Sequence, residues 1–224
     1  MNPFVLGPRA IAVYNVLRYM NLRVEGAELL PFGAALIAAR HYHHAFDGSA
    51  LVHGLPRQPH LFVALDWTSS ALQRRVMETA CRLAEWPVAI RTESFRGEAA
   101  VPAFERREAQ RYVRRAISYG AELLRRGEWL AIFPEGYPTI DPAGSRKRED
   151  EYLPFRPGVL AIAAQAQRVS ARPVPIFPAG FAYAAAGART NVTLRLGTPL
   201  HFERGADRRA FMAELEARVR ELSR

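Results

Sequence analysis

Three histidines lie close together and just ahead of an aspartate in the first quarter of the chain. His41, His43 and His44 fall within four residues, and Asp47 follows them. Histidine is the usual general base near neutral pH, and a nearby carboxylate can fix its tautomer and stabilise its protonated form. The run therefore predicts acid–base catalysis with Asp47. A solvated loop and a metal site are the alternative interpretations of the same residues.

A second candidate site is the run Phe133-Pro134-Glu135-Gly136, which ends an apolar segment that begins at Trp129. Loops at the carboxyl ends of strands in α/β sheets commonly hold ligands. Pro-Glu-Gly by itself is also an ordinary turn sequence, so this run is informative only together with the histidines.

The segments around these runs alternate between helical and strand patterns, which is typical of an α/β fold. Short apolar runs predict strands at 34–39, 61–65, 88–90, 129–133, 174–177 and 192–196. Longer periodic segments predict helices at 8–22, 70–83, 106–125, 158–167 and at the C-terminus. We expect a single α/β domain whose central, mixed but largely parallel sheet is flanked by helices. The two candidate runs would then follow two of its strands.

The order of the two runs, about ninety residues apart, resembles the glycerol-phosphate and lysophosphatidic acid acyltransferase family. That family has a His-x4-Asp motif, then Phe-x-x-Arg, then Phe-Pro-Glu-Gly. Further similar segments are Phe104-Glu105-Arg106-Arg107, Pro154-Phe155-Arg156-Pro157-Gly158, Val174-Pro175-Ile176-Phe177-Pro178 and Leu196-Gly197-Thr198-Pro199-Leu200. The resemblance extends over about residues 25–200, with an acyltransferase domain at 25–205 between an N-terminal amphipathic helix (1–24) and a C-terminal helix packed on the same domain (206–224).

The resemblance implies an O-acyltransferase of the 1-acylglycerol-3-phosphate type. It would move a fatty acyl group from acyl-CoA or acyl-carrier protein to a hydroxyl of a lysophospholipid acceptor. A histidine paired with Asp47 would be the base, and Arg106 or Arg107 would hold the acceptor's phosphate. The run Phe133-Pro134-Glu135-Gly136 would shape the acceptor site. The family's chemistry requires no cofactor and no metal.

The chain departs from the family pattern at the base itself. The family's histidine lies five positions before its aspartate, and Tyr42 occupies that position here. Continuity with the preceding strand favours His41 as the base. Helical spacing favours His43, because residues four apart share a helix face with each other, as His43 would with Asp47. Both assignments remain open from the sequence.

A second departure follows Gly136, where the family usually continues with Thr-Arg. This chain has Tyr137-Pro138 instead, so that arginine is missing. The basic run Arg146-Lys147-Arg148 is a candidate replacement for its phosphate contact, or else a solvated loop.

Composition limits the partners. The net charge of +9 indicates an anionic partner, but the charge is dispersed and not interleaved with aromatic residues, so no nucleic acid is expected. No apolar stretch is long enough to span a bilayer, and Cys81 is the single cysteine. The helix at 8–22 with its arginines suggests an anionic membrane surface as a partner. We therefore expect a cytoplasmic protein, peripheral on the inner face of the membrane.

Two other functions are compatible with these residues. One is a non-catalytic lipid- or acyl-binding member of the same fold, which would bind lysolipid without turning over a thioester. The other is a metal-dependent hydrolase built on the histidine cluster, which would contain stoichiometric zinc and be sensitive to chelators.

Overall fold

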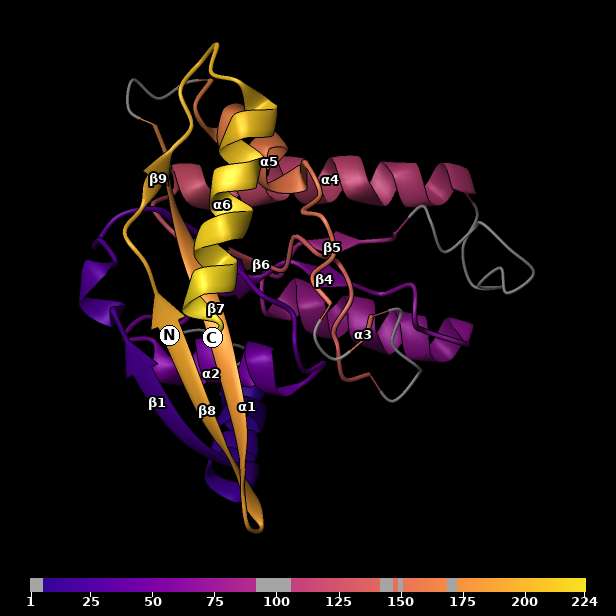
Figure 1. The fold of residues 1–224 in the computed structure, drawn as a ribbon. Helices are drawn as coiled ribbons and strands as arrows, with labels where there is room; N and C mark the ends of the chain where they lie inside the picture. The colour runs from indigo at the N-terminus through magenta and orange to yellow at the C-terminus, as the bar shows by residue number, and fades with distance from the viewer. Residues whose placement is uncertain (1–5, 92–105, 142–146, 149–150, 169–172) are drawn as a thin grey trace.

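The computed structural model describes the chain except for residues 1–5, 92–105, 142–146, 149–150 and 169–172 (Figure 1). The helices are α1 (Leu6–Tyr19), α2 (Phe46–Gly54), α3 (Ala71–Leu83), α4 (Arg106–Arg125), α5 (Gly158–Ala166) and α6 (Arg208–Leu222), with a short 3-10 helix, η2 (Ala27–Leu29). The strands are β1 (Met20–Glu25), β2 (Ala35–Ala39), β3 (His60–Leu61), β4 (Val63–Ala64), β5 (Val88–Ala89), β6 (Trp129–Ile132), β7 (Pro175–Ala186), β8 (Arg189–Leu196) and β9 (Leu200–His201).

The main sheet has the strand order β1-β8-β7-β2-β6-β3, with β9 also paired to β7. Pairs β1/β8, β7/β2, β2/β6 and β6/β3 are parallel, whereas β7 pairs antiparallel with β8 and β9. Strand β4, which follows β3 in the chain, forms a small parallel pair with β5. The Phe62 N–H bonds to Ala131 O of β6, and the Val63 N–H bonds to Pro87 O just before β5. This confirms the expected single α/β domain with a mixed, mostly parallel sheet flanked by helices (Figure 1).

The register of the parallel strands aligns the two candidate runs. Ala38 of β2 pairs with Ile132 of β6, so the residues that follow these strands emerge at the same edge of the sheet. Both strands are buried along their whole length, as their continuous apolar sequences predict. The β2 strand therefore delivers His41, and β6 delivers Pro134, to neighbouring positions.

Two apolar clusters cover the two faces of this sheet. On one face, residues of α1 and α2 pack with Ile37, Ala131 and Phe181. On the other, α4, α5 and α6 pack over Leu36, Leu130 and Ile176. Alternate residues of β2 and β6 belong to opposite clusters, as the twofold periodicity of strands requires. The site edge is thus held between two packed layers.

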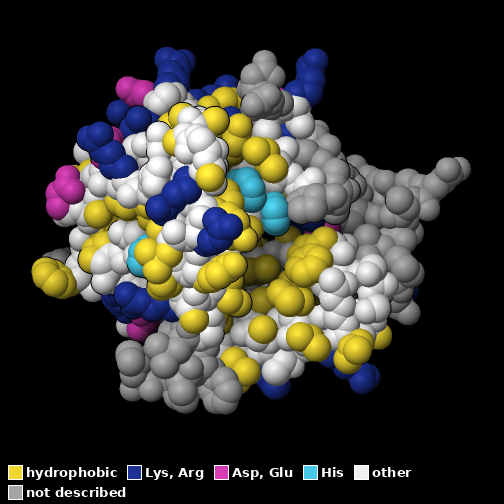
Figure 2. Space-filling view, turned by 90° about the horizontal axis from the view of Figure 1, so that it is seen from below, with side chains coloured by type: hydrophobic (Ala, Val, Ile, Leu, Met, Phe, Trp, Pro, Cys, Tyr) yellow, Lys and Arg dark blue, Asp and Glu magenta, His cyan; other side chains and the backbone are white. Residues whose placement is uncertain are grey.

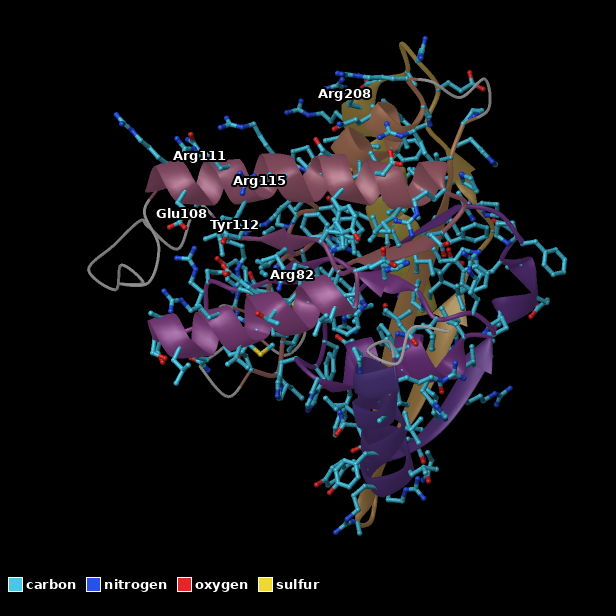
Figure 3. The ribbon with its side chains drawn as sticks, turned by 180° about the vertical axis from the view of Figure 1, so that it is seen from behind. Arg82, Glu108, Arg111, Tyr112, Arg115 and Arg208 are labelled. Carbon is cyan, nitrogen blue, oxygen red and sulfur yellow. The ribbon has the colours of Figure 1, made fainter. Side chains whose placement is uncertain are left out.

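Polar contacts join α3 to α4 at the side of the molecule where β4 and β5 lie. The Arg74 guanidinium binds both Glu78 on its own helix and Glu108 on α4, and it also donates to Tyr112 (3.0 Å). Glu108 and Tyr112 are labelled on α4 in Figure 3. Together these contacts fix the position of the small β4/β5 pair relative to the main sheet.

The sequence-based element boundaries are close for most segments and wrong near the N-terminus. The helix 106–125 agrees with α4, and the α3 helix begins after Ser70, whose side chain accepts from the Gln73 N–H as an N-cap. The helix expected at 8–22 ends at Tyr19, because residues 20–25 pair with β8 as strand β1. Of the described helices, none is long and apolar enough to cross a bilayer.

Candidate active site

The imidazole of His41 and the carboxylate of Asp47 are in direct contact. The two residues lie after β2 and in the first turn of α2, and His41 Nδ1 is 3.0 Å from Asp47 Oδ2. Since an ionised carboxylate only accepts hydrogen bonds, Nδ1 carries the proton and Nε2 has a free lone pair. The His41 ring also stacks on Phe133, with 4.3 Å between the ring centroids. The Asp47 contact and the Phe133 stacking therefore fix the orientation of the His41 ring.

Asp47 is fully buried, and its charge is compensated by a set of donors. Backbone N–H groups of Tyr42 (2.7 Å) and His43 (2.9 Å) donate to Oδ2, and the Tyr183 hydroxyl donates to Oδ1. Its place in the first turn of α2 also puts the carboxylate in the favourable field of the helix N-terminus. Such a buried anion keeps its acceptor geometry whether or not the imidazole is protonated.

His43 has a different environment from His41. Its Nδ1 accepts the backbone N–H groups of Ala45 (3.2 Å) and Phe46 (3.3 Å), so it caps the start of α2, and its proton must then be on Nε2. Burial lowers the pKa of His43 to about 4, so the ring stays neutral near pH 7. The ring stacks on Phe46 with 4.0 Å between centroids. Of the two histidines, only His41 reaches Asp47 with its ring.

Tyr183 is a site residue that sequence reasoning missed. It is on β7, far along the chain, and burial together with the negative charge of Asp47 raises its pKa well above the ordinary value. The hydroxyl therefore stays protonated and acts as a donor. Strand β7 is longer than the expected segment 174–177, and its extra residues bring Tyr183 beside Asp47. No local sequence motif predicts the contact between Tyr183 and Asp47.

Glu135 is buried at the turn after β6 and connects three segments. One carboxylate oxygen accepts the His41 backbone N–H (3.0 Å), and the other accepts the Lys147 amine (2.7 Å) and the Leu153 N–H (3.1 Å). The Lys147 amine also donates to the His41 carbonyl at 2.7 Å. Burial lowers the pKa of Lys147, while the charge of Glu135 opposes that shift. Glu135 and Lys147 thus hold the backbone of His41.

The basic run at 146–148 divides between different environments. Lys147 is buried and engaged as just described, whereas Arg148 is exposed. Arg146 lies outside the described residues. Lys147 is therefore not part of a solvated loop, because its amine forms an ion pair with the Glu135 carboxylate.

Gly136 is required by a close approach. Its φ of 78° lies in the left-handed region, and a Cβ there would be 2.8 Å from the Arg156 Nε. The Arg156 guanidinium carbon lies 5.3 Å from the centroid of the Tyr137 ring, and that of Arg91 lies 4.0 Å from the same centroid. Gly136 therefore leaves room for two guanidinium groups beside the turn.

A cavity of about 1000 Å³ opens beside His41. Its lining includes Phe133, Pro134 and Gly136 of the predicted run. Apolar residues from α4, α5, β6 and the link between β3 and β4 also line it: Phe62, Val113, Ile117, Ile132, Leu160, Ala161 and Ala164. Six arginines also line it, Arg91, Arg114, Arg156, Arg168, Arg208 and Arg209, and the lining in the described part of the chain includes no carboxylate. The lining thus combines apolar residues with arginines.

The expected Phe-x-x-Arg segment is only partly described. Phe104 and Glu105 are outside the described residues, and for Arg106 only the backbone, at the start of α4, is described. Arg107 is exposed and is not part of the described cavity lining. Arg91, which follows β5, does line the cavity, and both Asp66 oxygens bind its Nε at 2.8 Å. Its signal in the sequence was its position directly after a short apolar strand.

Within the described part of the chain, no three histidine, cysteine, aspartate or glutamate side chains converge as a metal site would require. The His43 Nδ1 atom, which a metal could use, instead caps α2.

Comparison with known proteins identifies the family and a similar fold. The family model described as Acyltransferase matches residues 21–182, which is most of the chain and includes both runs, and the chain belongs to that family. Its fold is similar to the crystal structure of the 1-acyl-sn-glycerophosphate (LPA) acyltransferase PlsC from Thermotoga maritima, with a TM-score of 0.59 and 16% sequence identity over 97% of this chain and 77% of that one. No curated protein matches the chain.

Proposed function

We propose that this acyltransferase moves a fatty acyl group from a CoA or carrier-protein thioester to a hydroxyl of lysophosphatidic acid or a related glycerolipid. The observation that carries the proposal is the His41–Asp47 pair at one end of a largely apolar cavity that also contains Arg91 and Arg156. A largely apolar cavity suits the weakly polar parts of the two substrates, and guanidinium groups suit a phosphate.

In the proposed reaction, His41 Nε2 takes the proton of the acceptor hydroxyl as its oxygen attacks the thioester carbonyl carbon. A carbon–oxygen bond forms, the carbon–sulfur bond breaks, and the protonated imidazole returns the proton to the departing thiolate. Asp47 stabilises the imidazolium that exists between these two transfers. The bonds of Asp47 to Tyr42 N–H and the Tyr183 hydroxyl would keep the carboxylate in place throughout.

The acceptor's phosphate would bind at the near end of the cavity. In lysophosphatidic acid the hydroxyl and the phosphate are on neighbouring carbons, so the phosphate-binding group must lie close to His41. Arg156 and Arg91 meet this requirement, since both flank Tyr137 beside Gly136. In this proposal Arg91 and Arg156 bind the acceptor's phosphate. The sequence-based assignment of that role to Arg106 or Arg107 stays a prediction.

The direct test is thiol release from acyl-CoA with lysophosphatidate as acceptor. We expect His41→Gln and Asp47→Asn to lower kcat by about 10²- to 10⁴-fold, the usual contribution of general base catalysis. The matched control, His43→Asn, should keep most of the activity because Nδ1 of His43 serves α2 and not the acceptor. Thermal melts of each variant check that it is folded. Full activity in Asp47→Asn, or a loss that follows His43 and not His41, would refute the mechanism.

A membrane surface is the proposed location. Large apolar side chains are exposed on α1 (Ile11, Tyr14, Leu17) and on α3 (Leu72, Val76). Both helices lie in the lower half of the view in Figure 1. Figure 2 shows the molecule from below, and on this face hydrophobic side chains surround a hollow with histidines beside it. Exposed apolar groups of this size mark contact with lipid or protein, and an acyl acceptor would come from lipid.

A further inference from the structure

Four of the six arginines that line the cavity come from the helical layer of α4, α5 and α6. Arg114 comes from α4, Arg168 from the turn after α5, and Arg208 and Arg209 from the first turn of α6. We call these four residues the distal arginines. Three separate elements bring them to one cavity, so their grouping is a feature of the tertiary fold and not of a local basic run.

Their distance from the reacting end follows from α5. Gly158, at the start of α5, is next to the Arg156 end of the cavity, and Arg168 comes ten residues later. A helical rise of 1.5 Å per residue separates the two by about 15 Å. The phosphate of a lysophosphatidate whose hydroxyl is at His41 cannot span that distance. An anion bound at Arg168 is therefore a different group from the acceptor's phosphate.

The charge of this end is uncompensated. Among the described residues, no carboxylate forms an ion pair with any of the four, and all four are on the surface at the cavity's rim. Arg208 and Arg209 also lie in the first turn of α6, where the helix dipole disfavours positive charge, and Asp207 caps that turn through the Arg209 N–H (2.8 Å). Two cations at such a position do not stabilise the helix, which favours a role in binding.

The chemistry between the ends identifies the class of ligand. The middle of the cavity is apolar but also includes the amides of Gln110 and Gln165. A fatty acyl chain alone would end in a methyl group at the arginines, which leaves their charge unused. A phosphopantetheine arm has a thioester at one end, amides along its length and a phosphate at the other end. Its extended length is similar to the separation along α5.

We propose that the distal arginines bind the phosphate of the phosphopantetheine arm of the acyl donor, with the arm running along α5 to its thioester at His41. This proposal rests on the proposed acyl transfer, and it names the part of the donor that the enzyme recognises. The phosphate is common to acyl-CoA and acyl-carrier protein. The arrangement assigns the two ends of one cavity to two phosphates, one from each substrate.

The test compares three donors with the same acyl group: acyl-CoA, acyl-carrier protein and S-acyl-pantetheine, which has no phosphate. The variant is Arg168→Gln/Arg208→Gln. We expect its KM for acyl-CoA to rise about tenfold with little change in kcat, because exposed arginines contribute ground-state binding of the phosphate. Its kinetics with S-acyl-pantetheine should equal those of the wild type. An equal loss with all three donors would overturn the proposal.

The matched control is Arg111→Gln/Arg115→Gln. These exposed arginines are also on α4, on either side of Arg114 in the sequence, but they are not in the described lining of the cavity. Figure 3 labels both on α4. The control has the same change of charge, so a similar rise in its KM would indicate nonspecific attraction and refute the assignment. If the KM of Arg168→Gln/Arg208→Gln rises with acyl-CoA alone, the arginines bind the nucleotide and the proposal fails. If it rises with both acyl-CoA and acyl-carrier protein, the arginines bind the phosphate of the arm.

A binding measurement tests the phosphate site independently of acyl transfer. Unacylated phosphopantetheine, which has no nucleotide, is titrated into wild type and variants by calorimetry, at low salt, without any acceptor. About tenfold weaker binding to Arg168→Gln/Arg208→Gln supports the phosphate site even if the wild type fails to transfer acyl groups to the chosen acceptor. Unchanged phosphopantetheine binding refutes the site even if transfer is efficient.

Discussion

His41 and His43 are two positions apart, yet their rings have opposite hydrogen-bonding states. His41 donates from Nδ1 to a carboxylate, and His43 accepts at Nδ1 from two backbone N–H groups. The sequence could not decide between them, because the decision depends on where α2 begins. Residue 45 is an alanine and offers no capping side chain, so His43 caps the helix from two residues upstream.

The state of His43 has a consequence for stability. Its pKa is about 4 in the folded protein and 6.5 for an ordinary histidine, so between these pH values the unfolded chain binds more protons. The free energy of unfolding therefore decreases as the pH falls through this window. The variant His43→Asn keeps an acceptor for the Ala45 and Phe46 N–H groups but cannot titrate.

We expect His43→Asn to lose less stability than the wild type between pH 7 and pH 4.5. The difference should be about 1 kcal/mol, since the ring's partial exposure screens the full effect. Urea unfolding at both pH values measures it. Identical pH dependence of the two proteins would show that His43 is not the titrating group.

The elements explain which parts of the site could be predicted. Strands β2 and β6 were evident from continuous apolar runs, and their register places His41 beside the Pro134 turn. By contrast, the alternation of Met20, Leu22 and Val24 was a strand signal that the preceding helical pattern concealed. The Tyr183–Asp47 contact joins residues 136 positions apart, and no periodicity encodes such a contact.

The loop that follows β6 depends on one buried ion pair. Lys147 and Glu135 both have no exposed side-chain surface, and each also bonds to the backbone, at His41 O and His41 N respectively. Breaking a buried pair by removing one partner leaves an uncompensated charge. We expect Lys147→Met to lower the free energy of unfolding by about 3 kcal/mol.

Chemical denaturation of Lys147→Met, with the exposed neighbour Arg148→Met as control, measures this effect. The control should change stability by less than about 0.5 kcal/mol. Adding Glu135→Gln to Lys147→Met should recover part of the loss, because it removes the orphaned charge. A Lys147→Met protein as stable as the Arg148→Met control would contradict the role of the pair.

At the scale of the whole molecule, net charge indicated anionic partners but not where they bind. The described structure separates an apolar surface on α1 and α3 from a cationic cavity between α4, α5 and α6. Composition alone cannot make this separation, because it depends on which helix faces remain uncovered after packing.

We expect Leu17→Asp/Leu72→Asp to reduce partition onto phosphatidylglycerol vesicles by about tenfold, since it places charge in exposed apolar positions of both helices. Vesicle sedimentation measures the bound fraction. The control is Phe32→Asp, which changes a fully exposed aromatic residue ahead of β2, at the opposite sheet edge from His41. Equal losses in the two proteins would argue against a specific lipid-binding face.

Strand β7 has a mechanical consequence. It carries Tyr183, which holds Asp47, and its Gly180 touches the backbone of Leu222 so closely that a Cβ would lie 2.3 Å from that carbonyl carbon. The other end of α6 carries Arg208 and Arg209. Strand β7 therefore links the His41–Asp47 pair to α6 and its arginines. Under the donor binding proposed above, this link sets the distance between the phosphate of the donor and its thioester.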